Sequence, residues 1–328
     1  MSASRLHVRK RNGYATNANL VWRRSASSSR IGGYGSCGFY AGVGSDSVPA
    51  ANSNPRTEYF VECSHKFLKT VREKGWPLDF FSYHSYSGPK EALRQVRFAD
   101  EHLTAYGFTR ETCERHFNEW LPFVRHGNLG SARQASGIAA ELIGLQNGPC
   151  DVACIYDARC NIGNYSPLFN PLTYEPHKAY YAFMAFNELR KLGTAVRCTS
   201  SDADLWAAAA KGDAGQAVML ANCSDRPISF RLDHPASWRV RITDAHRTWA
   251  ECPLPSVLGP ETFLVAVRSN ATDVVTDPAA EREHRKTILG AGWEFLRVRT
   301  EDVWRNRGKF AATGLDGIVL SLDRRTAD

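Results

Sequence analysis

One acidic residue stands within an otherwise apolar and aromatic stretch of the chain. Glu119 lies in HFNEWLPF, residues 116–123, between Asn118 and Trp120. An ionised carboxylate is costly to bury without a partner, so an acid in such a run indicates a strand end or a chemical task. A carboxylate beside an aromatic ring suits sugar chemistry. Retaining glycoside hydrolysis uses two carboxyl groups about 5–5.5 Å apart, one of which attacks the anomeric carbon.

Two polar side chains from a second strand-like run are candidate partners for this acid. His84 and Tyr86 lie two residues apart in LDFFSYHSY, residues 78–86. Alternate residues of a strand point to the same face, so we expect both side chains to hydrogen-bond Glu119 and keep it ionised. The alternative is a surface acid at a strand end and a structural histidine.

A repeated strand–helix unit would position these side chains. Within residues 31–193, an apolar run, a polar loop, an amphipathic helix and a glycine follow one another four times. The strands are expected in RIGGYGSCGFYA, LDFFSYHSY, RHFNEWLPF and CDVACIYDA, and the helices at about 57–74, from Pro89 to Gly107, from Ser131 to the segment QNG, and at 177–192. This alternation predicts a parallel α/β sheet with right-handed crossovers.

Two parallel architectures fit that pattern, a doubly wound sheet and a (βα)8 barrel. No G-x-G-x-x-G motif opens a helix, so a dinucleotide site is not expected. Polar residues gather where strands end, as they do at the active face of a barrel. These residues are Ser85, Tyr86, Asn118, Glu119, Tyr156 and Asp157. The sequence therefore favours a barrel, with four of its eight units visible.

The pattern changes after Gly193. Apolar and polar residues alternate with a period of two, separated by Asp, Pro and Ser turns, which predicts a small antiparallel β-sandwich over residues 194–268. Residues 271–328 read as a third, α/β region. The expected domains are thus a basic arm at 1–30, a half barrel at 31–193, the sandwich and this tail.

The net charge of +7 is concentrated at the N-terminus. Residues 1–30 contain seven Arg or Lys and no Asp or Glu, so they account for the whole excess. We expect this arm to be a solvated, poorly ordered terminus. A basic arm also suits nucleic acid or membrane, but stacking aromatics are not spaced along it, so nucleic acid is not an expected partner.

Composition limits location and cofactors. We read no signal peptide and no apolar run long enough to span a membrane, so a cytoplasmic protein with its nine cysteines reduced is expected. The spacing of Cys150, Cys154 and Cys160 matches no familiar zinc motif. Neither a metal nor another cofactor is expected.

Four segments in order carry a family resemblance: IGGYGSCGFYA, LDFFSYHSYS, FNEWLP and SPLFNPLTYEPHKAYYAFMAFNELRKLG. Together they resemble the C-terminal half of glycoside hydrolase family 39, the β-xylosidase and α-iduronidase group, over roughly residues 31–268. The resemblance implies a partial TIM barrel, a carbohydrate substrate such as a β-xyloside, and Glu119 as nucleophile. By the same resemblance His84 and Tyr86 line the sugar pocket and Gly32 and Gly33 belong to its rim. Asn118, Trp120, Tyr156 and Asp157 are further sugar-facing candidates.

The chain departs from that family in one motif. The family's acid/base residue lies in an Asn-Glu-Pro motif on the fourth strand, and this chain has no Asn-Glu-Pro. The expectation is therefore a truncated enzyme of low or no activity, with barrel edges open to self-association. A non-catalytic carbohydrate-binding remnant is the alternative.

The tail suggests one more function class. Residues 280–306 resemble the closing segment of Vsr-like and DUF559-like nuclease domains, but no Glu-x-Lys lies in the tail. A nucleic-acid-associated protein is thus the third and least favoured reading.

Overall fold

The computed structural model describes residues 30–42, 55–124, 128–160, 163 and 165–269. The chain divides into two compact units. The first contains the residues up to Phe123 together with Gly144–Tyr156, and the second contains Val124–Ile143 and the chain from Asp157. Helix α4 (Ala132–Gln146) contributes residues to both.

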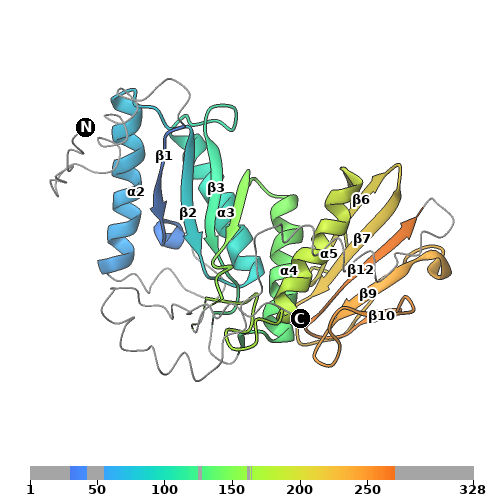
Figure 1. Ribbon diagram of the computed structural model, residues 1–328. Helices are drawn as coiled ribbons and strands as arrows, with labels where there is room; N and C mark the ends of the chain where they lie inside the picture. Colours follow the sequence, from blue (N-terminus) through green and yellow to red (C-terminus); the bar gives the residue numbers. More distant parts are fainter. Residues whose placement is uncertain (1–29, 43–54, 125–127, 161–162, 164, 270–328) are drawn as a thin grey trace, which may run out of the picture. The chain divides into compact units, whose positions relative to one another are not determined.

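The first unit is built on a four-stranded parallel sheet. Its strands, in spatial order, are β1 (Gly32–Ser36), β2 (Phe80–Ser85), β3 (Glu114–Trp120) and β4 (Val152–Ile155). The short 3-10 helix η1 (Phe39–Gly42) and helix α2 (Pro55–Glu73) follow β1, and helix α3 (Pro89–Ala105) follows β2. Figure 1 shows β1, β2 and β3 side by side, with α2 running along them. The predicted parallel sheet is confirmed.

Glycine and proline mark the ends of these helices. Pro89 is the first residue of α3, where its missing N–H costs no hydrogen bond. Gly75 and Gly107 follow α2 and α3 with φ angles of +60° and +78°. This left-handed conformation is the common way to end a helix, and it favours glycine.

Aromatic rings fill the core on one face of the parallel sheet. Phe81 and Tyr83 of β2 are fully buried, and the ring of Tyr83 stacks on Phe117 of β3 at 5.3 Å. Phe39 of η1 packs edge-on against both β2 rings, at 5.6 Å and 6.0 Å. This packing fixes η1 against the strand that carries His84.

A fully buried arginine ties β3 to the end of α3. Arg115 donates from Nε to Asp100 Oδ1 at 2.7 Å and from its Nη atoms to the carbonyls of Phe108, Thr109 and Cys113. Burial of this cation is tolerated because nearly every donor is paired.

The second unit contains a six-stranded antiparallel sheet and a two-stranded one. The larger sheet has the order β10-β9-β12-β7-β6-β5, and β11 pairs with β8 in the smaller. The strands are β5 (Thr194–Val196), β6 (Leu205–Gly212), β7 (Gly215–Asn222), β8 (Ile228–Ser229), β9 (Arg239–Thr243), β10 (Ala250–Cys252), β11 (Val257–Leu258) and β12 (Thr262–Ser269), with a short 3-10 helix, η4 (Pro235–Ser237), before β9. The predicted change from parallel to antiparallel structure is confirmed.

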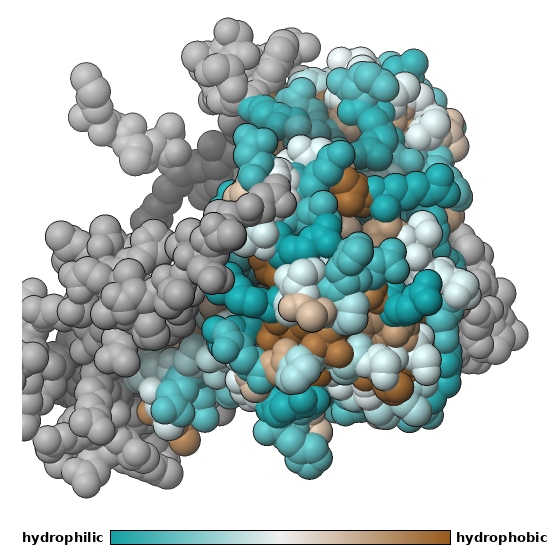
Figure 2. All heavy atoms as spheres, turned by 90° about the vertical axis from the view of Figure 1, so that its right-hand side faces the viewer, coloured by the Kyte–Doolittle hydropathy of each residue, from teal (hydrophilic) through white to brown (hydrophobic). Residues whose placement is uncertain are grey.

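Helix α5 (Lys178–Leu192) packs on this antiparallel sheet, mainly on β7 and β6. Its small buried residues, Ala179, Ala182 and Ala185, recur every three residues and allow a close approach. A cluster that includes Leu220, Ile242 and Leu258 forms a second buried layer in this unit. In Figure 2, which faces this unit, hydrophilic side chains cover most of the surface and small hydrophobic areas show between them.

Some predictions fall outside the residues that the structure describes. These are the basic arm apart from Arg30, and the nuclease-like tail. The partial barrel and the boundaries of the domains stay predictions. In the described part of the chain, none of the helices combines the length and the apolar character needed to cross a membrane.

Candidate functional site

A β-bulge in β3 sets the direction of Glu119. Tyr83 of β2 pairs with Phe117, but the next residue, His84, pairs with Glu119 and skips Asn118. The pairing of β3 with β4 shows the same extra residue, between Phe117 and Trp120. Two residues on the bulged strand oppose one on its neighbour, so the side-chain alternation shifts by one position. Glu119 consequently shares a face with His84, while Phe117 and Trp120 both enter the core.

Two side chains of β2 and its continuation contact one oxygen of Glu119. Tyr86 donates from its hydroxyl to Oε2 at 2.5 Å, and Nδ1 of His84 lies 3.2 Å from the same atom. Both contacts go to Oε2, and neither goes to Oε1. The structure therefore brings together the three residues that the sequence predicts as a cluster.

The imidazole of His84 is partly buried, and this sets its charge. Burial lowers the pKa of His84 below its usual value, although the Glu119 carboxylate acts in the opposite direction. The ring is therefore neutral at pH 7.

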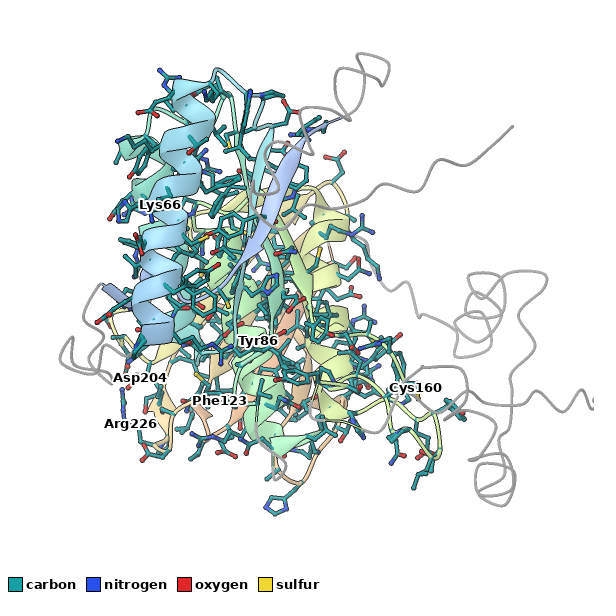
Figure 3. The ribbon with its side chains drawn as sticks, turned by 90° about the vertical axis from the view of Figure 1, so that its left-hand side faces the viewer. Lys66, Tyr86, Phe123, Cys160, Asp204 and Arg226 are labelled. Atoms are coloured by element: carbon teal, nitrogen blue, oxygen red, sulfur yellow. The ribbon has the colours of Figure 1, made fainter. Side chains whose placement is uncertain are left out.

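Tyr86 is supported by an aromatic neighbour that directly follows β4. The ring of Tyr156 lies edge-on to that of Tyr86 at a centroid distance of 6.2 Å, and the Tyr156 N–H donates to the Trp120 carbonyl at 3.0 Å. Figure 3 labels Tyr86 close to the end of the parallel strands. The candidate site thus lies where functional groups converge in parallel α/β folds.

Strand β1 and its loop contribute residues that sequence reasoning missed. The Gly35 N–H donates to Ser82 Oγ at 3.1 Å, and Tyr40 donates from its hydroxyl to the His84 carbonyl at 2.7 Å. The pKa of the Cys37 thiol is raised, chiefly by burial; Arg56 acts in the opposite direction, and the charge of Glu119 adds to the increase. For Cys37 and Tyr40, the available signal was their position within four residues of the end of β1.

Trp120 and Asn118, which were predicted to contact sugar, differ from Glu119 in their surroundings. Trp120 is 1% exposed and lies in the core, parallel to the ring of Phe117, because the bulge turns it away from Glu119. Asn118 is the extra residue of the bulge, and its buried Oδ1 has no hydrogen-bond partner among the described residues.

Gly32 and Gly33 pair with the start of β2. Their partners, Phe80 and Phe81, precede His84 by four and three residues, or about 13 and about 10 Å along the strand. A Cβ on Gly32 would meet the Phe80 carbonyl oxygen at 2.2 Å, so packing accounts for this glycine. Asp157, the last predicted residue of the site, pairs with Arg159 at 2.6 Å.

The cluster has the features of an anionic nucleophile or base. One carboxylate oxygen accepts a hydrogen bond from a phenol, and a nitrogen of a neutral imidazole lies 3.2 Å from the same oxygen. Within the ranges that the structure describes, His, Cys, Asp and Glu side chains do not gather in groups of three that would suit a metal ion.

The sequence matches no protein-family model and no curated protein. Solved structures do match. A glucosidase from Croceicoccus marinus is 15% identical over 79% of this chain and 64% of that chain, with a TM-score of 0.57. A family 39 β-xylosidase from Caulobacter crescentus is 19% identical, over 78% and 60% of the two chains, with a TM-score of 0.52.

A third match is the family 39 enzyme from Xanthomonas axonopodis pv. citri, which is 14% identical over 79% of this chain and 63% of that chain, at a TM-score of 0.52. The chain spans less than two thirds of the length of each of these structures. At such identities the likeness concerns the fold. In its fold, the chain resembles family 39 and other glycoside hydrolases.

Proposed function

We propose that this chain carries the nucleophile half of a retaining glycoside hydrolase site, with Glu119 as the nucleophile. The observation that carries the proposal is that two side chains, Tyr86 and His84, lie against the same oxygen of Glu119. Tyr86 and His84 both engage Oε2, which leaves Oε1 for attack on the anomeric carbon. The glycoside hydrolase fold supports the same reaction class.

The reaction has two steps. Oε1 of Glu119 forms a bond to the anomeric carbon as the bond to the leaving oxygen breaks, and that oxygen departs with the electron pair. Water then attacks the same carbon as the bond to Glu119 breaks, Glu119 leaves as a carboxylate, and the proton lost by the water passes to solvent; two inversions retain the configuration. The Tyr86 hydroxyl contacts the carboxylate throughout, and we assign it and His84 to holding the nucleophile in its attacking orientation.

Leaving-group protonation is the step for which this sequence carries no family motif. The chain has no Asn-Glu-Pro motif to supply the acid. Loss of a general acid costs about 10²–10⁴ in rate, but a leaving group that is stable as an anion needs no proton. We therefore propose low activity on alkyl glycosides and measurable activity on dinitrophenyl glycosides, with a β-xyloside or related sugar as substrate.

A covalent label tests this proposal. Dinitrophenyl 2-deoxy-2-fluoro-β-xyloside should transfer one fluorosugar to the full chain, because the fluorine slows hydrolysis of the glycosyl-enzyme more than its formation. Peptide mapping by mass spectrometry should place the label on Glu119. The variant Glu119→Gln should take no label.

Glu114→Gln is the matched control. Glu114 lies on the same strand, where it pairs with Arg30 and His116. This variant should label like the unchanged protein. A label on another residue contradicts the nucleophile assignment, while saturable binding of xylose without labelling supports the non-catalytic alternative.

A further inference from the structure

The backbone at His84 lacks a strand partner on its β1 side. The last pair between β1 and β2 is Ser36 with Tyr83, so β1 ends before it reaches His84. Carbonyls of successive strand residues point to opposite sides. The Ser85 carbonyl accepts from the Leu121 N–H, on the β3 side, and the His84 carbonyl therefore faces the side where β1 has ended.

Tyr40 occupies this position. Its hydroxyl donates to the His84 carbonyl at 2.7 Å, and burial raises the pKa of Tyr40, so the phenol remains protonated at neutral pH. The neighbouring residue Phe39 is 2% exposed and packs against Phe81 and Tyr83. The phenol is thus attached to the rigid core and not to a free loop.

The same short segment also limits the imidazole of His84. Gly35 has a φ of +72°, and a Cβ built on it would lie 3.4 Å from Nε2 of His84. Gly35 is itself held by its hydrogen bond to Ser82, on β2. The ring of His84 is thus bounded by β1 on one side and by Glu119 on the other.

We propose that Tyr40 is a positioning residue of this site, which completes the hydrogen bonding of β2 where β1 ends and so holds His84 against Glu119. The inference rests on the proposed function for its effect on rate, but not for its effect on His84. Tyr40 touches no substrate in this account and acts through the backbone of His84.

Tyr40→Phe tests the proposal, because it removes one hydroxyl and keeps the ring. The NMR titration midpoint of the His84 imidazole should rise in this variant, since a loosened ring is less buried and its charged form is better solvated. With the dinitrophenyl glycoside, kcat should fall about tenfold while KM changes much less. The midpoint is measurable even if the chain has no turnover.

Tyr83→Phe is the matched control. Tyr83 precedes His84 on β2, and its buried hydroxyl has no hydrogen-bond partner within the described part of the chain. This variant should leave the His84 midpoint and kcat unchanged. Thermal unfolding of both variants checks that the fold is kept.

A double variant separates positioning from a general structural effect. In a His84→Gln background, Tyr40→Phe should lower kcat little further, because two changes in one chain of contacts are not additive. Equal His84 midpoints in the unchanged protein and Tyr40→Phe would overturn the proposal. Loss of turnover with an intact shift of the midpoint would instead count against the proposed function alone.

Discussion

Glu119 lies directly opposite His84 in the pairing of β2 with β3, one residue out of step with the pair that precedes it. This shift of one residue determines which side chain of β3 faces His84. A regular ladder would place Asn118 opposite His84 and turn the carboxylate to the other face, because side chains alternate along a strand. Glu119 therefore lies on the same face of the sheet as His84 because of a local irregularity in the backbone of β3.

Removal of the Tyr86 hydroxyl should affect rate more than binding. Hydrogen bonds to charged groups contribute about 1.5–3 kcal/mol, and Tyr86→Phe deletes a 2.5 Å bond to the proposed nucleophile. We expect kcat on a dinitrophenyl glycoside to fall about 10–100-fold. Tyr59→Phe, at an exposed position of α2, should leave kcat unchanged. Equal rates for the two variants would contradict the role given to Tyr86.

Arg115 should dominate the stability of the parallel unit. Arg115→Met leaves Asp100 without its cation and leaves buried carbonyls without donors, so the free energy of unfolding should fall by about 3–5 kcal/mol. Arg115→Lys should recover little, because an ammonium cannot reproduce the guanidinium fork.

Arg110→Met is the control for Arg115. Arg110 pairs with Asp151 at 2.8 Å, but its side chain is 44% exposed. A surface pair of this kind contributes about 0–1 kcal/mol. Urea unfolding followed by tryptophan fluorescence measures both variants, and similar losses would disprove the special weight given to burial.

His102 should make the stability of the protein depend on pH. Its Nε2 shares a hydrogen bond with the Ser64 hydroxyl at 2.9 Å, and burial, together with the nearby His65, lowers the pKa of His102 to about 4. The unfolded chain takes up this proton near pH 6.5, so stability is complete above that pH. It falls as the pH drops toward 4, by about 3 kcal/mol from this group.

His102→Gln removes that contribution and keeps a polar partner for Ser64. Its unfolding free energy should change less between pH 7 and pH 4 than that of the unchanged protein. His246→Gln, at an exposed loop position, should retain the full pH dependence. Parallel pH profiles for the unchanged protein and His102→Gln would rule out this origin.

Asn222, at the end of β7, should stabilise the neighbouring loops of the antiparallel unit. Its Nδ2 donates to the carbonyls of Arg226, Leu258 and Gly259, and its Oδ1 accepts from Ser224. Asn222→Asp puts a carboxylate against three carbonyls, so it should destabilise more than Asn222→Ala. Hydrogen exchange should rise in residues 222–228 and 256–262, while exchange in β2 and β3 stays unchanged.

Sequence patterns predicted the elements well where periodicity was strong. Alternation along β2 correctly placed His84 and Tyr86 on one face, and the helix expected at 57–74 is α2 at 55–73. Gly75 indicated where this helix ends, because few residues other than glycine adopt a positive φ at low cost.

The fine geometry of the site was not predictable in the same way. The bulge depends on how β3 pairs with two neighbours at once, which a local pattern does not encode, and the burial of Trp120 follows from it. Tyr40 was missed because its partner is a backbone carbonyl 44 residues away. Gly32 was read as a pocket residue, whereas its close neighbour is the Phe80 backbone.

The pairing on both sides of β3 already accommodates its extra residue. Deleting Asn118 would give a regular ladder from Phe117 to Trp120 and would leave Glu119 opposite His84 and Trp120 opposite Ser85. A homologue that keeps Glu and Trp but lacks one residue before them would thus be expected to keep the acid on the same face as the imidazole.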